Sequence, residues 1–302
     1  MKKIQIKQVD AFTKTPLKGN PAGIVLNAEG LTDEEMQLIA REMNLSETAF
    51  VMKSQVADFK VRFFTPVTEV DICGHATIGT FYALAEENRI KLDVDYIVVT
   101  QETKAGILPV EIYSINGILQ KIMMTQAKPQ FREISISPEE VANILNIPSE
   151  QIYRDYPLEM AYTGLWHLMV PIKNIEFVKS MKPNMKKLRE MNLEFGIITT
   201  HVFSFETQEE DSQVHTRSFA PAVNVEEDPA TGTANGALGA YLVKNKILKP
   251  ENGVLKITAE QGYEINRDSK IFVEVHMGEE EIEKVKVGGI AVTSLDGTLY
   301  LP

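Results

Sequence analysis

One segment of the chain occurs twice, and this repeat limits the folds that the chain can adopt. Arg62-Phe63-Phe64-Thr65-Pro66 resembles Arg217-Ser218-Phe219-Ala220-Pro221, and both copies read Arg-x-Phe-x-Pro. Seven residues after each proline, a polar residue opens a run of small residues: Cys73 in the first copy and Asp228 in the second. This spacing needs no gap. The repeat therefore predicts two similar halves, each a sheet around a helix, related by an approximate two-fold axis.

The pattern of apolar residues predicts many strands and few helices. Two capping boxes mark helix starts: Thr32 with Glu35, and Ser137 with Glu140. Further helices are expected over residues 75–88 and 231–246. Strands are expected near residues 4–12, 24–26, 48–53, 58–65, 96–126 in three segments, 161–171, 195–206, 213–219, and after the second of these helices up to residue 302. Strands do not alternate strictly with helices, which favours an α+β fold with mostly antiparallel sheets.

The length of 302 residues predicts about two domains. A polar stretch at residues 128–136 is the natural boundary. We therefore expect an N-terminal lobe over residues 1–127 and a C-terminal lobe over 128–302, whose last strand is free to cross back to the first lobe.

Composition excludes several classes of protein. The net charge is −11, which argues against non-specific binding to nucleic acid. The N-terminus has no continuous apolar stretch and no run approaches the roughly 20 apolar residues that span a bilayer, so a cytoplasmic location is expected, with no membrane partner. Cys73 is the single cysteine, which excludes an intramolecular disulfide.

The sequence also lacks the common cofactor motifs. The five histidines show no ligand spacing, so no metal site is expected. There is no Gly-x-Gly-x-x-Gly dinucleotide fingerprint, no phosphate-binding loop and no Gly-x-Ser-x-Gly elbow. The sequence therefore contains no motif for a metal ion or a nucleotide cofactor.

Each copy of the repeat ends a strand, turns, and opens a helix with glycine and small residues. A helix N-terminus carries unsatisfied amides and a partial positive charge, and glycine lets a ligand approach the backbone. Two such N-termini that faced each other would hold an anion such as a carboxylate. The alternative is that both are small-residue helix starts packed in a core. The matched pair favours the ligand hypothesis.

Glu47 is the candidate general acid/base. It lies at the junction between a helix and the apolar strand Thr48-Ala49-Phe50-Val51, where partial burial raises a carboxyl pKa toward the useful range. On the local sequence alone, an exposed glutamate at a loop end or a cap partner is the simpler interpretation.

Three more residues lie at the helix starts. His75 could donate a hydrogen bond to an anion or relay a proton, or be purely structural. Cys73 could act as a thiol base or nucleophile, because a helix N-terminus lowers a thiol pKa. Asp228 suits the N-cap of the following helix, a role compatible with contacting substrate. The neighbouring Glu226 and Glu227 are expected to be solvated.

At these residues the chain resembles the phenazine-biosynthesis PhzF-like family. The resemblance rests on Val9-Asp10-Ala11-Phe12, Gly19-Asn20-Pro21-Ala22-Gly23, Ser46-Glu47-Thr48, Cys73-Gly74-His75-Ala76-Thr77 and Glu227-Asp228-Pro229-Ala230-Thr231-Gly232-Thr233-Ala234. It implies a diaminopimelate-epimerase-like fold of two pseudo-symmetric lobes, with the site in the cleft between them, and a cofactor-independent isomerase that is commonly a homodimer.

The resemblance also implies roles for individual residues. Glu47 matches the general acid/base, and His75 and Asp228 match its partners. Gly74, Gly232 and Thr233 match the cradle of the substrate carboxylate. Cys73 is retained beside this cradle, whereas the related epimerases use a pair of cysteines.

The sequence therefore supports three candidate functions. The first is an isomerase in which Glu47 shifts a proton on a small carboxylate-bearing substrate, in a biosynthetic process like that of the phenazine family. The second is an amino-acid racemase or epimerase that uses Cys73 with a second base. The third is a catalytically silent protein that binds a small molecule.

Overall fold

The computed structural model describes all 302 residues. The chain divides into two compact units. The first consists of Met1–Thr125 together with Gly288–Pro302, and the second consists of Gln126–Val287. Each unit is a mixed, mostly antiparallel sheet around one central helix, which confirms the α+β prediction. None of the helices is long and apolar enough to cross a bilayer.

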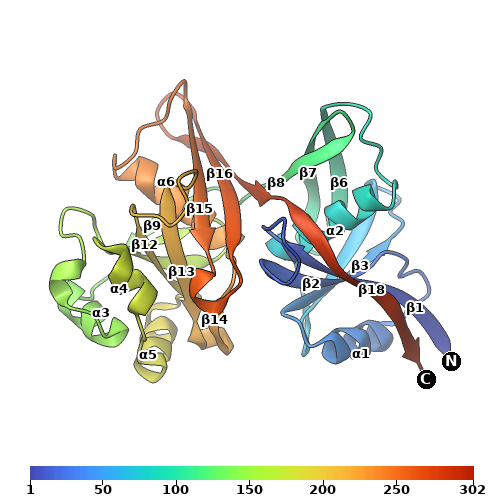
Figure 1. Cartoon of the computed structure of the whole chain (residues 1–302), viewed down its shortest axis with the longest axis horizontal. Coiled ribbons are helices and arrows are strands. Elements are labelled where there is room, and N and C mark those ends of the chain that lie inside the picture. The colour runs from blue at the N-terminus through green and yellow to red at the C-terminus, as the bar shows by residue number, and fades with distance from the viewer. The chain divides into compact units, whose positions relative to one another are not determined.

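The first unit contains both ends of the chain. Its elements are β1 (Lys2–Ala11), β2 (Asn20–Val25), α1 (Asp33–Met43), β3 (Glu47–Met52), β4 (Phe59–Phe64), β5 (Glu69–Val70), α2 (Gly74–Glu86), β6 (Tyr96–Thr103), β7 (Gly106–Ile115), β8 (Ile118–Thr125) and β18 (Ala291–Leu301). Strand β1 pairs antiparallel with both β18 and β2. Strands β2 and β3 are parallel, β3 and β4 antiparallel, and β6, β7 and β8 form an antiparallel meander. Figure 1 shows β18 beside β1, so the two termini lie together.

The second unit repeats this order of elements with additions. Its elements are β9 (Gln130–Glu133), α3 (Pro138–Leu145), β10 (Glu159–Tyr162), β11 (Trp166–Pro171), α4 (Ile175–Ser180), α5 (Met185–Phe195), β12 (Thr199–Ser204), β13 (Val214–Ala220), β14 (Val225–Asp228), α6 (Gly232–Lys244), β15 (Val254–Gln261), β16 (Ser269–Met277) and β17 (Ile282–Gly289). Again a parallel pair, β11 with β12, precedes an antiparallel pair, β12 with β13. The strand after the central helix again runs parallel to an earlier one: β15 to β13, as β6 to β4. The predicted repeat is confirmed at the level of topology.

Local signals set the helix starts as predicted. Thr32 Oγ1 accepts a hydrogen bond from the Glu35 amide, and the Glu35 carboxylate accepts one from the Thr32 amide, over 3.2 and 2.9 Å. The second capping box, Ser137 with Glu140, is also present, and Pro138 fills the first helical position. These reciprocal bonds satisfy amides that a helix N-terminus otherwise leaves without partners.

The two central helices are buried on almost every face, which explains their small residues. A Cβ atom added to Gly239 of α6 would come within 2.7 Å of Val273, so the helix backbone lies directly against β16. Gly79 of α2 approaches Val9 of β1 in the same way, at 3.4 Å for an added Cβ. Such close approach lets one sheet wrap around one helix.

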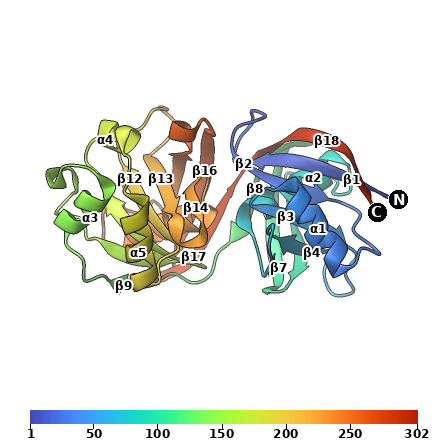
Figure 2. The ribbon, with the colours of Figure 1, turned by 90° about the horizontal axis from the view of Figure 1, so that it is seen from below.

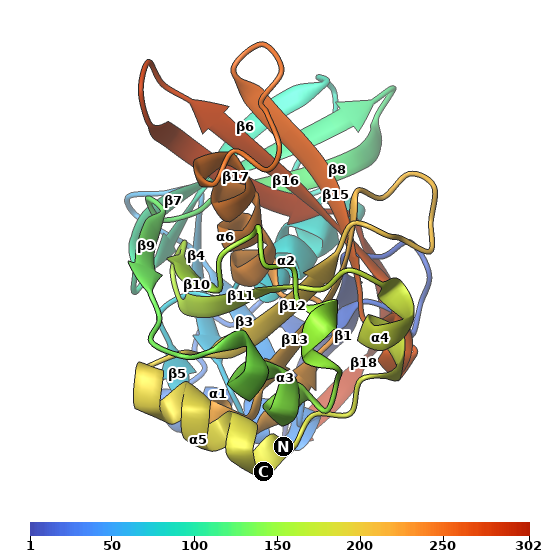
Figure 3. The same cartoon turned by 90° about the vertical axis from the view of Figure 1, so that its left-hand side faces the viewer.

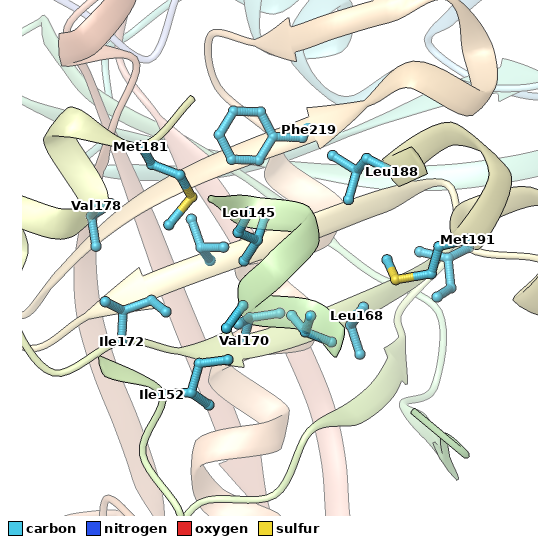
Figure 4. Packing of buried hydrophobic residues seen from close by; sticks show 14 of the residues in the cluster. Leu145, Ile152, Leu168, Val170, Ile172, Val178, Met181, Leu188, Met191 and Phe219 are labelled. Atoms are coloured by element: carbon cyan, nitrogen blue, oxygen red, sulfur yellow. The ribbon is translucent and has the colours of Figure 1, made fainter. Parts of the chain in front are cut away.

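Alternation along the strands gives each sheet two apolar faces. In the first unit, Val25 packs toward α1 while Ile24 faces α2. Figure 2 shows α1 beside β3 and β4. In the second unit, Val170, Val202 and Phe219 pack against α3, α4 and α5, and Figure 3 shows these helices in front of the strands with α6 behind. Figure 4 shows the resulting apolar cluster, in which Leu145, Met181 and Leu188 pack with Val170 and Phe219 of the strands.

The sequence missed some elements of the second unit. Helices α4 and α5 and strand β14 were not expected, and the polar stretch chosen as a boundary contains β9, which pairs with β10. Helix α4 has only six residues, and α5 is too polar for its few buried positions to stand out.

Candidate active site

Glu47, Cys73 and His75 lie together in the first unit. Glu47 opens β3, where it pairs with Ala22 of the parallel neighbour β2. Cys73 is the N-cap residue of α2, and His75 is the second residue of that helix. The Glu47 Oε2 atom lies 3.3 Å from His75 Nε2, and the Cys73 Sγ atom lies 3.5 Å from His75 Nδ1. The strand start and the helix start thus bring three reactive groups to one place.

These groups are largely, not fully, shielded from water. The side chains of Glu47 and His75 are 19% and 10% exposed. Burial lowers the pKa of His75 to about 4, because its charged form loses hydration. The imidazole is therefore neutral at neutral pH, and one of its nitrogens can donate while the other accepts.

The N-terminus of α2 has room for an anion. The side chain of Cys73 makes no capping bond to the first-turn amides. Gly74 is the first helical residue, and a Cβ atom added there would meet no atom within 4 Å. Open space beside the first residue of a helix, next to a carboxylate and an imidazole, suits a substrate that carries a carboxylate.

We predict that Gly74→Ala raises the KM for substrate at least tenfold but leaves the melting temperature within about 1 °C of wild type. The methyl group meets nothing in the folded chain, yet it would occupy the space next to the first-turn amides. Steady-state kinetics and thermal unfolding check the two halves of the prediction. An unchanged KM would show that no substrate group approaches this helix start.

The second helix start belongs to the second unit and differs from expectation. Thr231, not Asp228, is the N-cap residue of α6. Asp228 ends β14, and its Oδ2 atom accepts a 2.5 Å hydrogen bond from the Thr231 hydroxyl. The buried Gln261 side chain donates to the Asp228 carbonyl over 2.8 Å. Asp228 is thus held next to the helix start, where the side chain of the N-cap residue Thr231 makes no cap bond.

The repeat has a gap that the sequence spacing concealed. Helix α2 begins at Gly74, 12 residues after Arg62, whereas α6 begins at Gly232, 15 residues after Arg217. The three extra residues form a 3₁₀ turn over Pro221–Val223. The counterpart of Cys73 is therefore Thr231, and the earlier pairing of Cys73 with Asp228 was wrong. The absence of a second thiol still holds.

Gly232 and Thr233 are the first two residues of α6, at positions equivalent to Gly74 and His75. The carbonyl of Thr233 accepts a 2.9 Å hydrogen bond from the buried Thr163. The seven predicted site residues thus form two groups: Glu47, Cys73, Gly74 and His75 in the first unit, and Asp228, Gly232 and Thr233 in the second.

Both arginines of the repeat anchor the segment that leads into a central helix. Arg62 forms a two-bond ion pair with Glu69 of β5, at 2.7 and 2.9 Å. Arg217 forms the same pair with Glu227 of β14, at 2.8 and 2.7 Å. In each copy the helix begins five residues after this glutamate. Glu227, expected to be solvated, is in fact only 9% exposed and paired.

A buried network next to Arg217 was also missed. His215 lies 2.6 Å from Glu260 and 2.8 Å from Glu264, with its side chain fully buried. Burial works against a charge on His215, but the two carboxylates outweigh it and raise its pKa. The sequence offers no short spacing that joins these residues, because β13, β15 and the turn after β15 supply them.

Two other buried histidines of the second unit have a lowered pKa, in contrast to the raised pKa of His215. His167 and His201 are fully buried on the face of their sheet that α6 covers, and each is hydrogen-bonded to a hydroxyl, Thr199 and Ser218 respectively. Burial lowers the pKa of each to about 3. They hold no charge in the folded protein near neutral pH.

We predict that the free energy of unfolding falls between pH 6.5 and 5, by about 1–2 kcal/mol for each depressed histidine. His75, His167 and His201 have folded pKa values below the unfolded value of 6.5, so the unfolded chain takes up protons first as the pH falls. The contribution of these three neutral histidines to the stability of the protein is therefore complete above pH 6.5 and is progressively lost as the pH falls below 6.5. His215 has the opposite pH dependence, because its pKa is raised. Its contribution to the free energy of unfolding is lost as the pH rises through its folded pKa.

Urea unfolding at pH 7, 6 and 5 measures this loss. His167→Asn should reduce the pH slope, because the variant lacks one of the histidines whose pKa is lowered by burial. An identical slope in wild type and His167→Asn would contradict the prediction.

Comparison with known proteins shows which family the chain belongs to. The family model described as phenazine biosynthesis-like protein matches residues 9–297. The chain belongs to the PhzF family. An uncharacterized isomerase of Clostridium acetobutylicum is 41% identical and covers 100% of this chain and 99% of its own length. The trans-2,3-dihydro-3-hydroxyanthranilate isomerase of Pseudomonas aeruginosa is 31% identical over 97% of this chain and 98% of its own. With such relatives, this PhzF-family chain is an isomerase.

Solved structures agree with this placement. A PhzF-family phenazine biosynthesis protein from Bacillus anthracis superposes with a TM-score of 0.92, 38% identity and full coverage of both chains. A hydroxyproline epimerase from Agrobacterium vitis superposes with a TM-score of 0.65 and covers 99% of this chain and 91% of its own. At 15% identity, that second likeness shows the fold alone.

Proposed function

We propose that this PhzF-family isomerase moves a proton from one carbon to another on a small substrate that carries a carboxylate, without a cofactor. Glu47 is the general acid/base in this proposal. The observation that carries it is the 3.3 Å approach of the Glu47 carboxylate to His75 at the open N-terminus of α2. A base, a neutral imidazole and free helix amides together meet the needs of such a reaction.

The chemistry divides among these groups. The first-turn amides of α2 bind the substrate carboxylate and stabilise negative charge that develops in the transition state. Glu47 removes a proton from carbon and returns it elsewhere on the same face. His75 orients the substrate and the Glu47 carboxylate, and its neutral ring can pass a proton in either direction.

We further propose that Asp228, Gly232 and Thr233 complete the site from the second unit, in the cleft between the lobes. The local geometry of α6 supports this role. Thr231 ties the Asp228 carboxylate to the helix start over 2.5 Å, next to the amides of Gly232 and Thr233. Cys73 would lie at the edge of the bound substrate. The homodimer implied by the resemblance remains a prediction.

Both the named relatives and the first-turn amides of α2 support a small carboxylate as the substrate. A relative at 31% identity is named for trans-2,3-dihydro-3-hydroxyanthranilate, a ring that carries a carboxylate and an amino group. That compound is the first probe, followed by a panel of small cyclic and linear carboxylic acids.

The experiment is turnover in deuterium oxide, followed by NMR and mass spectrometry of recovered substrate and product. Thermal-shift screening of the panel selects compounds for this assay, because a bound ligand raises the melting temperature. A proton shift through Glu47 predicts deuterium at the carbon that gains the proton, in wild type and not in Glu47→Gln. Unchanged deuterium incorporation in Glu47→Gln would overturn the mechanism.

A second candidate, an amino-acid racemase, is favoured by one contact. The Cys73 sulfur lies 3.5 Å from His75 Nδ1, which could accept its proton. Against it, the equivalent position in the second unit is Thr231, so a pair of thiols cannot form. The same deuterium assay with L- and D-amino acids separates the candidates, because a racemase exchanges the α-proton and yields the mirror-image amino acid.

A further inference from the structure

The three reactive groups of the first unit also have the arrangement of metal ligands. One donor atom from each of Glu47, Cys73 and His75 can be chosen so that all three lie within 4.8 Å of one another. These donors are a carboxylate oxygen, a sulfur and an imidazole nitrogen. They come from two elements, β3 and the start of α2, which is why no ligand spacing exists in the sequence.

Two of the three separations between donor atoms are close to those around a tetrahedral ion. Bond lengths of about 2.0–2.1 Å to nitrogen and oxygen and about 2.3 Å to sulfur place tetrahedral N and O ligands about 3.4 Å apart and N and S ligands about 3.6 Å apart. The observed separations are 3.3 Å between His75 Nε2 and Glu47 Oε2, and 3.9 Å between His75 Nε2 and Cys73 Sγ. The third pair, Glu47 and Cys73, lies within 4.8 Å, so rotations of these two side chains would complete the geometry.

The backbone already holds the ligands in place. The Cys73 carbonyl accepts hydrogen bonds from the Thr77 amide and hydroxyl, at 3.0 and 2.8 Å. Glu47 belongs to a strand paired with β2 on one side and β4 on the other. Binding would therefore require little ordering of the chain.

We propose that Glu47, Cys73 and His75 form a binding site for a divalent transition ion of the zinc type, with the fourth position open to water. A mixed set of thiolate, imidazole and carboxylate selects zinc or cobalt over magnesium or calcium, which prefer oxygen ligands alone. A bound ion would occupy the Glu47 oxygen, so the metal-loaded form could not use Glu47 as a base. This inference concerns binding and does not rest on the proposed isomerisation.

Cobalt(II) is the probe, because its spectrum reports geometry and ligands. Metal-free protein is titrated anaerobically with Co²⁺ in the absence of substrate. We expect visible bands of tetrahedral intensity and a near-ultraviolet charge-transfer band from thiolate to cobalt, both displaced by one equivalent of Zn²⁺. Because the chain has a single cysteine, the charge-transfer band can come only from Cys73.

Variants complete the test. Cys73→Ser should lose the charge-transfer band, and Cys73→Ser and His75→Gln should each weaken binding more than about 100-fold, because losing a ligand costs more than losing an outer-shell partner. His276→Gln should bind like wild type. If Cys73→Ser does not fold, wild type alkylated with iodoacetamide replaces it.

A spectrum that stays that of aqueous cobalt would overturn the proposal, as would equal binding and an equal band in Cys73→Ser. Either result would leave the role of Glu47 untouched, because no turnover is measured. Conversely, normal deuterium exchange in Glu47→Gln would sink the isomerase mechanism without affecting this spectrum.

Discussion

Glu47→Gln is expected to lower kcat/KM by about 10²–10⁴-fold, the usual contribution of a positioned general acid/base. Glutamine keeps the shape of the side chain but cannot accept a proton from carbon. KM should change little, because the proposed carboxylate-binding amides of α2 remain. The loss should therefore lie in kcat, measured by steady-state kinetics on the compound selected by thermal shift.

Glu47→Asp is the matched control. It retains a carboxylate but withdraws it by one methylene from the 3.3 Å contact with His75. Activity should fall between those of wild type and Glu47→Gln. Turnover by Glu47→Gln within a factor of three of wild type would assign the proton transfer to another group.

Arg217→Met is expected to lower the free energy of unfolding by about 3–5 kcal/mol, the typical cost of breaking a buried ion pair. The Arg217 side chain is 7% exposed and makes two bonds to Glu227. It also donates to the carbonyls of Val178 and Met181, at 2.8 and 3.0 Å. Methionine would leave the Glu227 carboxylate buried without this partner. Urea unfolding at pH 7 measures the loss.

The repeat supplies the control for this variant. Arg62 makes the equivalent pair with Glu69, but its side chain is 19% exposed. After Arg62→Met, Lys104 would still lie 2.6 Å from Glu69 and neutralise it. We expect the free energy of unfolding to fall by about 1–2 kcal/mol, a value between the costs of breaking an exposed and a buried ion pair. Equal losses in the two variants would mean that burial does not determine the cost.

Sequence reasoning succeeded where the information is local. The capping boxes at Thr32 and Ser137 were correct because a few neighbouring residues decide a helix start. The three strands over residues 96–126 were correct because Gly106 and Asn116-Gly117 interrupt an apolar pattern, and all three adopt positive φ values. The α+β class followed from the number and order of such segments.

It failed where the information lies in three dimensions. The family resemblance made His75 a partner of Glu47, but no spacing in the sequence shows that the two are in contact, because the packing of α2 against β3 creates that contact. The extra turn at Pro221–Val223 went unnoticed because Pro66 and Pro221 look equivalent. The network of His215 with Glu260 and Glu264 joins residues 45 and 49 positions apart, beyond any local pattern.

The pairing of β1 with β18 has a consequence for synthesis on the ribosome. Lys2 lies opposite Leu301, so the first unit obtains its last strand only after the whole second unit has been synthesised. Until then β1 has an unpaired edge, the kind of edge that invites association with other chains. The second unit is one continuous segment, Gln126–Val287, and can fold as it emerges. Although it is made later, it can therefore finish folding first.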